Sequence, residues 1–254
     1  MATDRTTPVG HDAVILAGGR ATRLGGVPKP TVVLDGATLL DRALAAARDA
    51  ARTVVVGPDP VLPPGRDVLA TREDPPFGGP VAGLDAGLRA LDAAAVPAPA
   101  HDAPPWVLVL AVDVPRAGDA VPLLRAAVDL PVGDLDGAYL VREGHAQWLV
   151  GLYRRDALRR ALDAVAASAS PGAAGLAGVP VRRLVAELSC AEVPDRDAVS
   201  ADVDTWDDLR RLTVGLHAGR HTASRTGSHT VVAARAGTEP ATPRPPTDRP
   251  GGHR

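Results

Sequence analysis

The 254-residue sequence predicts an α/β fold, a Rossmann-like arrangement of three layers in which a mostly parallel sheet lies between helices. Two observations support this prediction. Short apolar runs, which are typical of buried strands, alternate along the chain with longer stretches whose apolar residues recur at helical spacing. Glycine- and proline-rich turns separate most of these segments. The hydrophobic content of 45% is sufficient for one sizeable core.

The first part of the chain shows this alternation in order. Residues 13–17 are apolar and end at a pair of glycines, which predicts a buried first strand. Leucine and alanine recur at helical spacing over 39–51 and predict a helix. Residues 53–56 predict a second strand that ends at Gly57-Pro58, and 67–71 predict a short third one.

The middle of the chain continues the pattern. A loop rich in proline and glycine precedes a helix over 81–94. The most apolar strand of the sequence covers 106–112, and a helix over 118–128 follows it. Because parallel strands end at a common edge, the loops after the strands should meet there.

The last third predicts a hairpin and smaller elements. Strands over 135–142 and 148–153 flank Glu143-Gly144. The expected elements after the hairpin are helices over 155–167, 181–188 and 206–212, and a strand over 191–193.

Three regions divide the chain by composition. Residues 1–12 are polar and predict a flexible N-terminus, and 13–212 predict one globular domain. Residues 213–254 predict a disordered basic tail, because from His217 onward Glu239 and Asp248 are its only acids. The tail lacks aromatic residues, so we expect no nucleic-acid partner.

Composition also limits the function classes. The single cysteine, Cys190, excludes an intrachain disulfide or a cluster of cysteine metal ligands. The sequence contains no apolar run long enough to span a membrane, and Met1–Asp12 lacks the apolar region of a signal peptide. We therefore expect a cytoplasmic protein without a membrane partner. Our working expectation for its assembly is a monomer or a weak homo-oligomer.

A glycine loop with cations follows the first strand. Gly18 and Gly19 allow a sharp turn that exposes backbone N–H groups, and Arg20, Arg23 and Lys29 come within a dozen residues. Lys29 is the only lysine of the chain, and a compact ammonium acts differently from a planar guanidinium. These features predict a phosphate-binding site.

The spacing of this loop excludes two common phosphate sites. A P-loop requires a Gly-Lys pair, which occurs nowhere in the sequence. A dinucleotide-binding loop requires Gly-x-Gly-x-x-Gly, whereas here Gly18 and Gly19 are adjacent and the next glycine is Gly25. The remaining pattern, Leu-Ala-Gly-Gly-x-x-x-Arg-x-Gly followed by Lys, resembles the loop of nucleotidyltransferases that use NTP.

Four motifs narrow the resemblance to the molybdenum cofactor guanylyltransferase family. The loop Leu16–Lys29 resembles its signature loop, and Gly78–Leu84 resembles the segment beside its guanine pocket. Asp113-Val114-Pro115 resembles its metal site. Asp202–Thr205 stands where the family has the last of these motifs, and we call it the closing segment. One departure is Gly57, where some members have Asn. The resemblance implies a fold of the nucleotidyltransferase type.

The resemblance also implies the donor site. GMP would pass from Mg·GTP to the phosphate of molybdopterin, with release of pyrophosphate. Arg23 would clamp the β- and γ-phosphates, Lys29 would reach the α-phosphate, and Asp113 would hold Mg²⁺. Asp204 would either approach the metal or cap the last helix. The other expected nucleotide contacts are Leu16, Ala17, Gly18, Gly19, Asp74, Gly79 and Pro80.

The expected acceptor site rests on fewer observations than the donor site. His145, Gln147 and Trp148 lie near the predicted hairpin turn, in the half of the fold that faces the acceptor in the resembling family. A flat, amide-like pterin suits hydrogen bonding by Gln and stacking by Trp. The alternative is a hairpin with one buried aromatic residue.

Other functions stay open at this point. One is cytidylyl transfer to the same cofactor, and another is nucleotidyl transfer to a different phosphorylated acceptor such as a sugar phosphate. A non-catalytic nucleotide-binding domain would predict loss of Arg23, Lys29 or Asp113, and the sequence retains all three.

Overall fold

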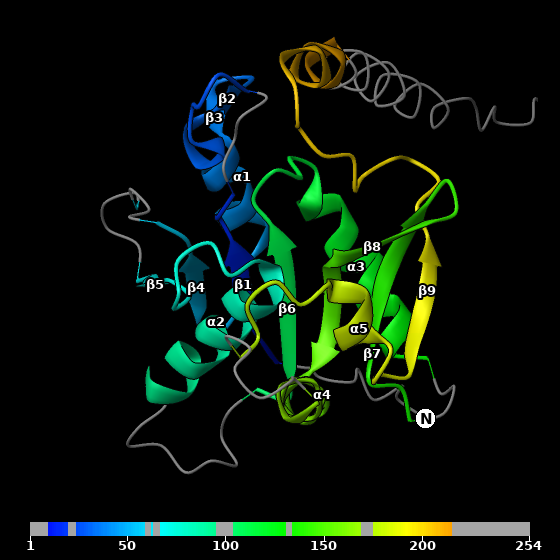
Figure 1. The fold of residues 1–254 in the computed structure, drawn as a ribbon. Coiled ribbons are helices and arrows are strands. Elements are labelled where there is room, and N and C mark those ends of the chain that lie inside the picture. Colours follow the sequence, from blue (N-terminus) through cyan, green and yellow to red (C-terminus); the bar gives the residue numbers. More distant parts are fainter. Residues whose placement is uncertain are drawn as a thin grey trace, which may run out of the picture. The chain divides into compact units, whose positions relative to one another are not determined.

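The computed structural model describes residues 10–19, 24–58, 62, 67–94, 104–130, 134–168 and 175–214 (Figure 1). By its contacts the chain divides into two units, Met1–Thr213 and Val214–Arg254. Nearly all described residues belong to the first unit. The predicted N-terminus up to residue 9 and most of the predicted tail lie outside the described residues.

Seven strands of the described part form one sheet in the order β5-β4-β1-β6-β8-β7-β9. All neighbours pair in parallel except β8, which runs antiparallel to both β6 and β7. This confirms the predicted mostly parallel sheet. The strands are β1 His11–Leu16, β4 Thr53–Val56, β5 Leu69–Thr71, β6 Trp106–Ala111, β7 Gly137–Arg142, β8 His145–Arg154 and β9 Cys190–Pro194.

Helices cover both faces of this sheet, as the sequence predicts. On one face α1 (Leu39–Ala46) contacts α3 (Ala117–Val128). On the other, α2 (Pro80–Ala94), α4 (Arg155–Ala167) and α5 (Val181–Val185) contact one another (Figure 1). A further helix covers 206–214.

The elements form where the apolar pattern places them. Ala13, Val14 and Ile15 of β1 are fully buried because the strand is covered on both faces. In α1 the stripe Leu39, Leu40, Ala43 and Leu44 faces the core. Thr38 and Asp41 form a capping box that fixes the start of that helix.

The structure differs from the prediction at several element ends. Strand β1 begins at His11, two residues before the predicted start, and helix α1 ends at Ala46 rather than at residue 51. The pattern also gave no sign of the 3₁₀ turn η2 (Lys29–Thr31) or of a two-stranded hairpin. That hairpin pairs β2 (Val33–Leu34) with β3 (Ala37–Thr38). No described helix is both long enough and apolar enough to cross a bilayer.

Candidate active site

A cavity of about 310 Å³ lies at the edge where the parallel strands end. The glycine loop after β1, the loop after β5 and Asp113 after β6 all contribute to it. Its lining residues are Leu16, Gly18, Gly19, Val56, Glu73, Phe77, Gly79, Pro80, Gly83, Ala111, Val112, Asp113 and Leu149. The predicted convergence of these loops is therefore observed.

The glycine loop is held against the end of β4. The Ala17 N–H donates to the Val56 carbonyl at 2.7 Å, and Gly19 adopts a φ of +128° that favours glycine. A Cβ at Gly57 would lie 3.0 Å from the carbonyl carbon of Ala17 and 3.2 Å from the Gly18 nitrogen. Gly57 therefore lets the glycine loop pack closely on the end of β4, and a side chain at this position would displace the loop.

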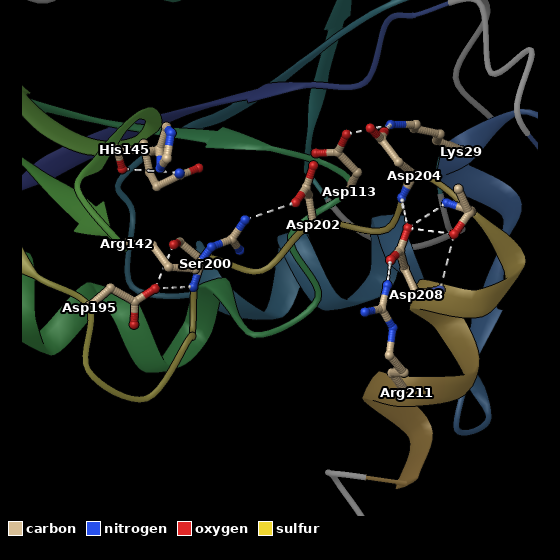
Figure 2. Close-up of polar contacts among 12 residues, drawn as sticks. Lys29, Asp113, Arg142, His145, Asp195, Ser200, Asp202, Asp204, Asp208 and Arg211 are labelled. Carbon is tan, nitrogen blue, oxygen red and sulfur yellow. Dashed lines mark hydrogen bonds and ion pairs between the residues drawn. The ribbon is translucent and has the colours of Figure 1, made fainter.

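Lys29 binds two carboxylates at once. Its ammonium donates to Asp113 Oδ2 at 2.6 Å and to Asp204 Oδ1 at 2.5 Å (Figure 2). The Lys29 side chain is only 15% exposed, and those of Asp113 and Asp204 are 22% and 37% exposed. The three residues come from η2, from the end of β6 and from the closing segment. The fold thus assembles three predicted site residues.

Charge and burial oppose each other in this cluster. Burial favours the neutral amine of Lys29, but Asp113 and Asp204 outweigh it and raise the pKa of that side chain. Lys29 is therefore charged at neutral pH. Burial raises the pKa of the Asp113 carboxyl, and the Lys29 ammonium works against this rise.

The closing segment is fixed to the loop after β6 by its backbone. The Val203 N–H donates to the Asp113 carbonyl at 2.8 Å, and Val203 is fully buried. Asp202 accepts a hydrogen bond from Arg142 Nη2 at 3.3 Å, at the carboxyl end of β7 (Figure 2). These contacts hold Asp204 beside Asp113.

The helix that follows is capped by Thr205. Thr205 Oγ1 accepts from the Asp208 N–H at 3.2 Å, and the Asp208 carboxylate accepts from the Thr205 N–H at 2.8 Å. This reciprocal pair is a capping box. The Asp204 carboxylate accepts from Lys29 instead, and its role at a metal stays a prediction.

The donor set suits a divalent cation that also binds phosphate. Among the described residues no group of three or more His, Cys, Asp or Glu side chains forms a metal cage. Asp113 and Asp204 nevertheless converge on one positive charge, the Lys29 ammonium. Mg²⁺ is commonly held by one or two carboxylates, with substrate phosphates and water completing its shell. Asp113 and Asp204 are the described residues that could hold such an ion.

The cavity wall beyond the glycine loop carries an acid that sequence reasoning missed. Glu73 is 8% exposed, lines the cavity and accepts a hydrogen bond from the Phe77 N–H at 3.1 Å. Gly79 and Pro80 line the cavity as predicted. Asp74, the acid that the resemblance selected, lines a separate hollow of about 720 Å³ together with Arg72. Two adjacent acids in one loop look equivalent in sequence, and burial distinguishes them.

The hairpin residues lie at the same edge of the sheet. His145 is exposed, and its Nδ1 is 3.0 Å from the Glu143 carbonyl oxygen. Gln147 Nε2 donates to the His145 carbonyl at 3.2 Å. Trp148 is half-buried and packs against the core, whereas the next residue, Leu149, lines the cavity. Two roles were predicted for Trp148, stacking on a pterin and packing as the aromatic residue of the hairpin. Its contacts with the core match the second.

Two predicted phosphate ligands cannot be placed. Arg20 and Arg23 lie outside the described residues, as does the rest of the segment 20–23. Leu24 on its far side is buried, with 1% of its surface exposed. The role of Arg23 stays a prediction from the sequence.

Comparison with known proteins identifies the family. A sequence model of the MobA-like NTP transferase domain matches residues 13–191. The chain belongs to the MobA-like NTP transferase family. A curated relative, the molybdenum cofactor guanylyltransferase of Nitrobacter hamburgensis, is 34% identical over 158 residues, which cover 59% of this chain and 71% of the relative.

Solved structures support the fold of this NTP transferase. The molybdopterin-guanine dinucleotide biosynthesis protein A of Archaeoglobus fulgidus has a TM-score of 0.54 and 20% identity, covering 79% of this chain and 95% of its own. The 2-C-methyl-D-erythritol 4-phosphate cytidylyltransferase of Thermus thermophilus has a TM-score of 0.52 and 23% identity, covering 82% and 98%. The predicted α/β nucleotidyltransferase fold is confirmed.

Proposed function

We propose that this NTP transferase moves GMP from Mg·GTP to the terminal phosphate of molybdopterin and releases pyrophosphate. The observation that carries the proposal is the cluster of Lys29, Asp113 and Asp204 beside the glycine-loop cavity. A triphosphate in this cavity would meet the Lys29 ammonium and the two carboxylates that bind it. The name of the curated relative supports both the guanosine donor and the cofactor acceptor.

The donor would bind with its phosphates on the glycine loop. Backbone N–H groups around Gly18 and Gly19 can donate to phosphate oxygens, and Arg23 would supply charge to the β- and γ-phosphates. Glu73 lies on the cavity wall with Gly79 and Pro80. A carboxylate there can accept hydrogen bonds from the ring N–H and the amino N–H of guanine. Cytosine does not present this pair of donors on one edge. We therefore assign the base to this wall.

The transfer needs positioning and charge neutralisation more than covalent help from the protein. An oxygen of the acceptor phosphate attacks the α-phosphorus, and the bond from that phosphorus to the pyrophosphate oxygen breaks. Lys29 would turn from its carboxylates to the α-phosphate and stabilise the charge that develops. Mg²⁺ held by Asp113 and Asp204 would neutralise the phosphates when bound.

The acceptor would approach from the β7–β8 hairpin. His145 and Gln147 lie at its turn, and Leu149 reaches the cavity. Gln147 can hydrogen-bond an amide-like pterin edge, whereas Trp148 packs against the core and supports the hairpin. His145 and Gln147 are thus the acceptor contacts that we propose.

A thermal-shift panel of the four NTPs with Mg²⁺ tests the donor assignment. We expect GTP to raise the melting temperature most and Lys29→Ala to abolish its shift. Arg48→Ala is the matched control, because the Arg48 side chain is 78% exposed and also carries one positive charge. Equal shifts from all four NTPs, or a full GTP shift in Lys29→Ala, would contradict the proposal.

A further inference from the structure

Phe77 is an aromatic residue in an unusual position. It is the only phenylalanine of a chain in which aromatic residues make up 2%. It is 56% exposed and lines the cavity beside the glycine loop. An apolar ring at the wall of a ligand cavity calls for an explanation other than core packing.

The backbone at Phe77 is held in a conformation that bulky residues rarely adopt. Its φ is +61°, in the left-handed region. The Phe77 N–H donates to Glu73 Oε1 at 3.1 Å, and Glu73 is itself 8% exposed. A buried carboxylate therefore fixes the residue. Such conformations persist where the surroundings determine them, and they concentrate at ligand sites.

Turn geometry alone does not require phenylalanine here. Gly78 and Gly79 follow directly, and Gly79 has a φ of +90° that glycine adopts without strain. A glycine at position 77 would satisfy the same backbone. The ring is thus the feature that the turn does not explain.

We propose that the Phe77 ring stacks on the nucleobase of the bound nucleoside triphosphate. The proposal rests on the proposed function, because it takes this cavity wall as the base site. Glu73 then meets the edge of the base through its carboxylate, and Phe77 covers a face. The same hydrogen bond that sets the Phe77 backbone couples the two contacts. Stacking accepts any base, whereas the Glu73 edge discriminates between bases.

Calorimetric titration of the full chain in Mg²⁺ tests this with three variants and two kinds of ligand. Phe77→Ala should bind GTP about tenfold more weakly than the wild type, the loss typical of one stacked base. Phe77→Gly should show the same loss, although glycine adopts this φ readily. Phe77→Tyr should bind as the wild type does. Inorganic tripolyphosphate, which has no base, should bind equally to all four proteins.

Three results would overturn the inference. One is unchanged GTP affinity in Phe77→Ala. Another is recovery of affinity in Phe77→Gly, which would show that only the backbone conformation matters. The third is an equal loss for GTP and tripolyphosphate, which would assign Phe77 a structural role in the loop.

Titrations with ATP and CTP separate this inference from the proposed function. If the wild type prefers another NTP to GTP, the guanylyl assignment fails, and the variants compared on that NTP still decide on stacking. If GTP binds to the wild type and to Phe77→Ala alike, the stacking inference fails alone. A wild-type chain that binds no NTP would overturn both.

Discussion

Lys29 shows how one residue type is selected by its surroundings. Its ammonium serves two carboxylates on different segments, at 2.6 Å and 2.5 Å. A compact charge with three rotatable donors can satisfy both carboxylates, and in the proposed reaction it would turn to a phosphate. A guanidinium is planar and larger, and its donors point in fixed directions. The chain otherwise uses arginine for its basic residues, so the lysine here matches the geometry of the site.

Lys29→Arg should therefore fail despite keeping the charge. We expect the rate of pyrophosphate release to fall about 100-fold or more, the typical loss when a charge-stabilising donor is misplaced. A coupled pyrophosphate assay with Mg·GTP and molybdopterin measures it. A Lys29→Arg rate within a few-fold of the wild type would show that charge alone suffices.

Gly57 is a second residue whose type is determined by its surroundings, because backbone atoms of the glycine loop lie close to it. In Gly57→Ala the added Cβ would lie 3.0 Å and 3.1 Å from the carbonyl carbon and oxygen of Ala17, so the loop backbone must move. We expect weaker GTP binding, measured by calorimetry, with a small change in melting temperature. Gly10→Ala is the control, because its nearest contact would be 3.8 Å away. GTP affinity equal to the wild type in Gly57→Ala would contradict this account of the loop.

At the scale of elements, β1 is anchored by a buried acid. Asp12 is fully buried, lies 3.2 Å from Arg52 Nη2 and also forms an ion pair with Arg155 at the start of α4. It thereby joins three segments of the fold. Removing one member of a buried ionic group leaves the others without their counter-charge.

Asp12→Ala should lower the free energy of unfolding by about 3–5 kcal/mol. Urea denaturation followed by circular dichroism measures this. The control is Asp49→Ala, since the Asp49 side chain is 64% exposed and pairs with Arg48 only at 3.9 Å, and its effect should stay within about 0.5 kcal/mol. Similar losses of unfolding free energy in both variants would show that burial of the Asp12 ion pairs adds nothing to stability.

The segment after β9 depends on another acid, Asp195. Its carboxylate accepts from the Val199 N–H at 2.8 Å. It also accepts from the N–H and the Oγ of Ser200, at 2.9 Å and 2.5 Å (Figure 2). Burial favours the neutral acid, but the hydrogen bonds from Ser200 and Val199 outweigh it and lower the pKa of Asp195. The charged form thus stabilises the turn that leads to the closing segment.

This predicts a pH-dependent contribution to stability. A carboxyl with a lowered pKa stabilises the fold fully above its unfolded pKa of about 3.9, and that contribution disappears as the pH falls through the folded value. Asp195→Asn should be less stable than the wild type at pH 7, and the difference should shrink below about pH 4. Urea denaturation at both pH values measures it. A gap that widens on acidification would contradict the assignment.

At the scale of the whole molecule, the apolar pattern alone predicts the architecture. The predicted strand over 53–56 and helix over 155–167 match β4 and α4, because both have continuous or periodic apolar residues. The start of β1 was missed because Asp12 reads as a polar residue. Its burial depends on Arg52 and Arg155, which are distant in sequence.

The candidate site was predictable as far as short motifs specify it. Lys29 and Asp113 follow recognisable motifs, and the fold brings them to 2.6 Å from each other. The choice between Glu73 and Asp74 could not be made from the sequence, because it depends on which side chain turns inward. Likewise, Thr205 and not Asp204 caps the last helix, and this depends on where Lys29 lies.

The most direct test of the proposed function is identification of the product by mass spectrometry. The purified chain is incubated with Mg²⁺, molybdopterin and either GTP or CTP, with Asp113→Asn in parallel. The account predicts a molybdopterin–GMP dinucleotide and one pyrophosphate for each molecule formed, with little product from CTP and about 100-fold slower formation in Asp113→Asn. A cytidine dinucleotide as the main product, or a full rate in Asp113→Asn, would contradict it.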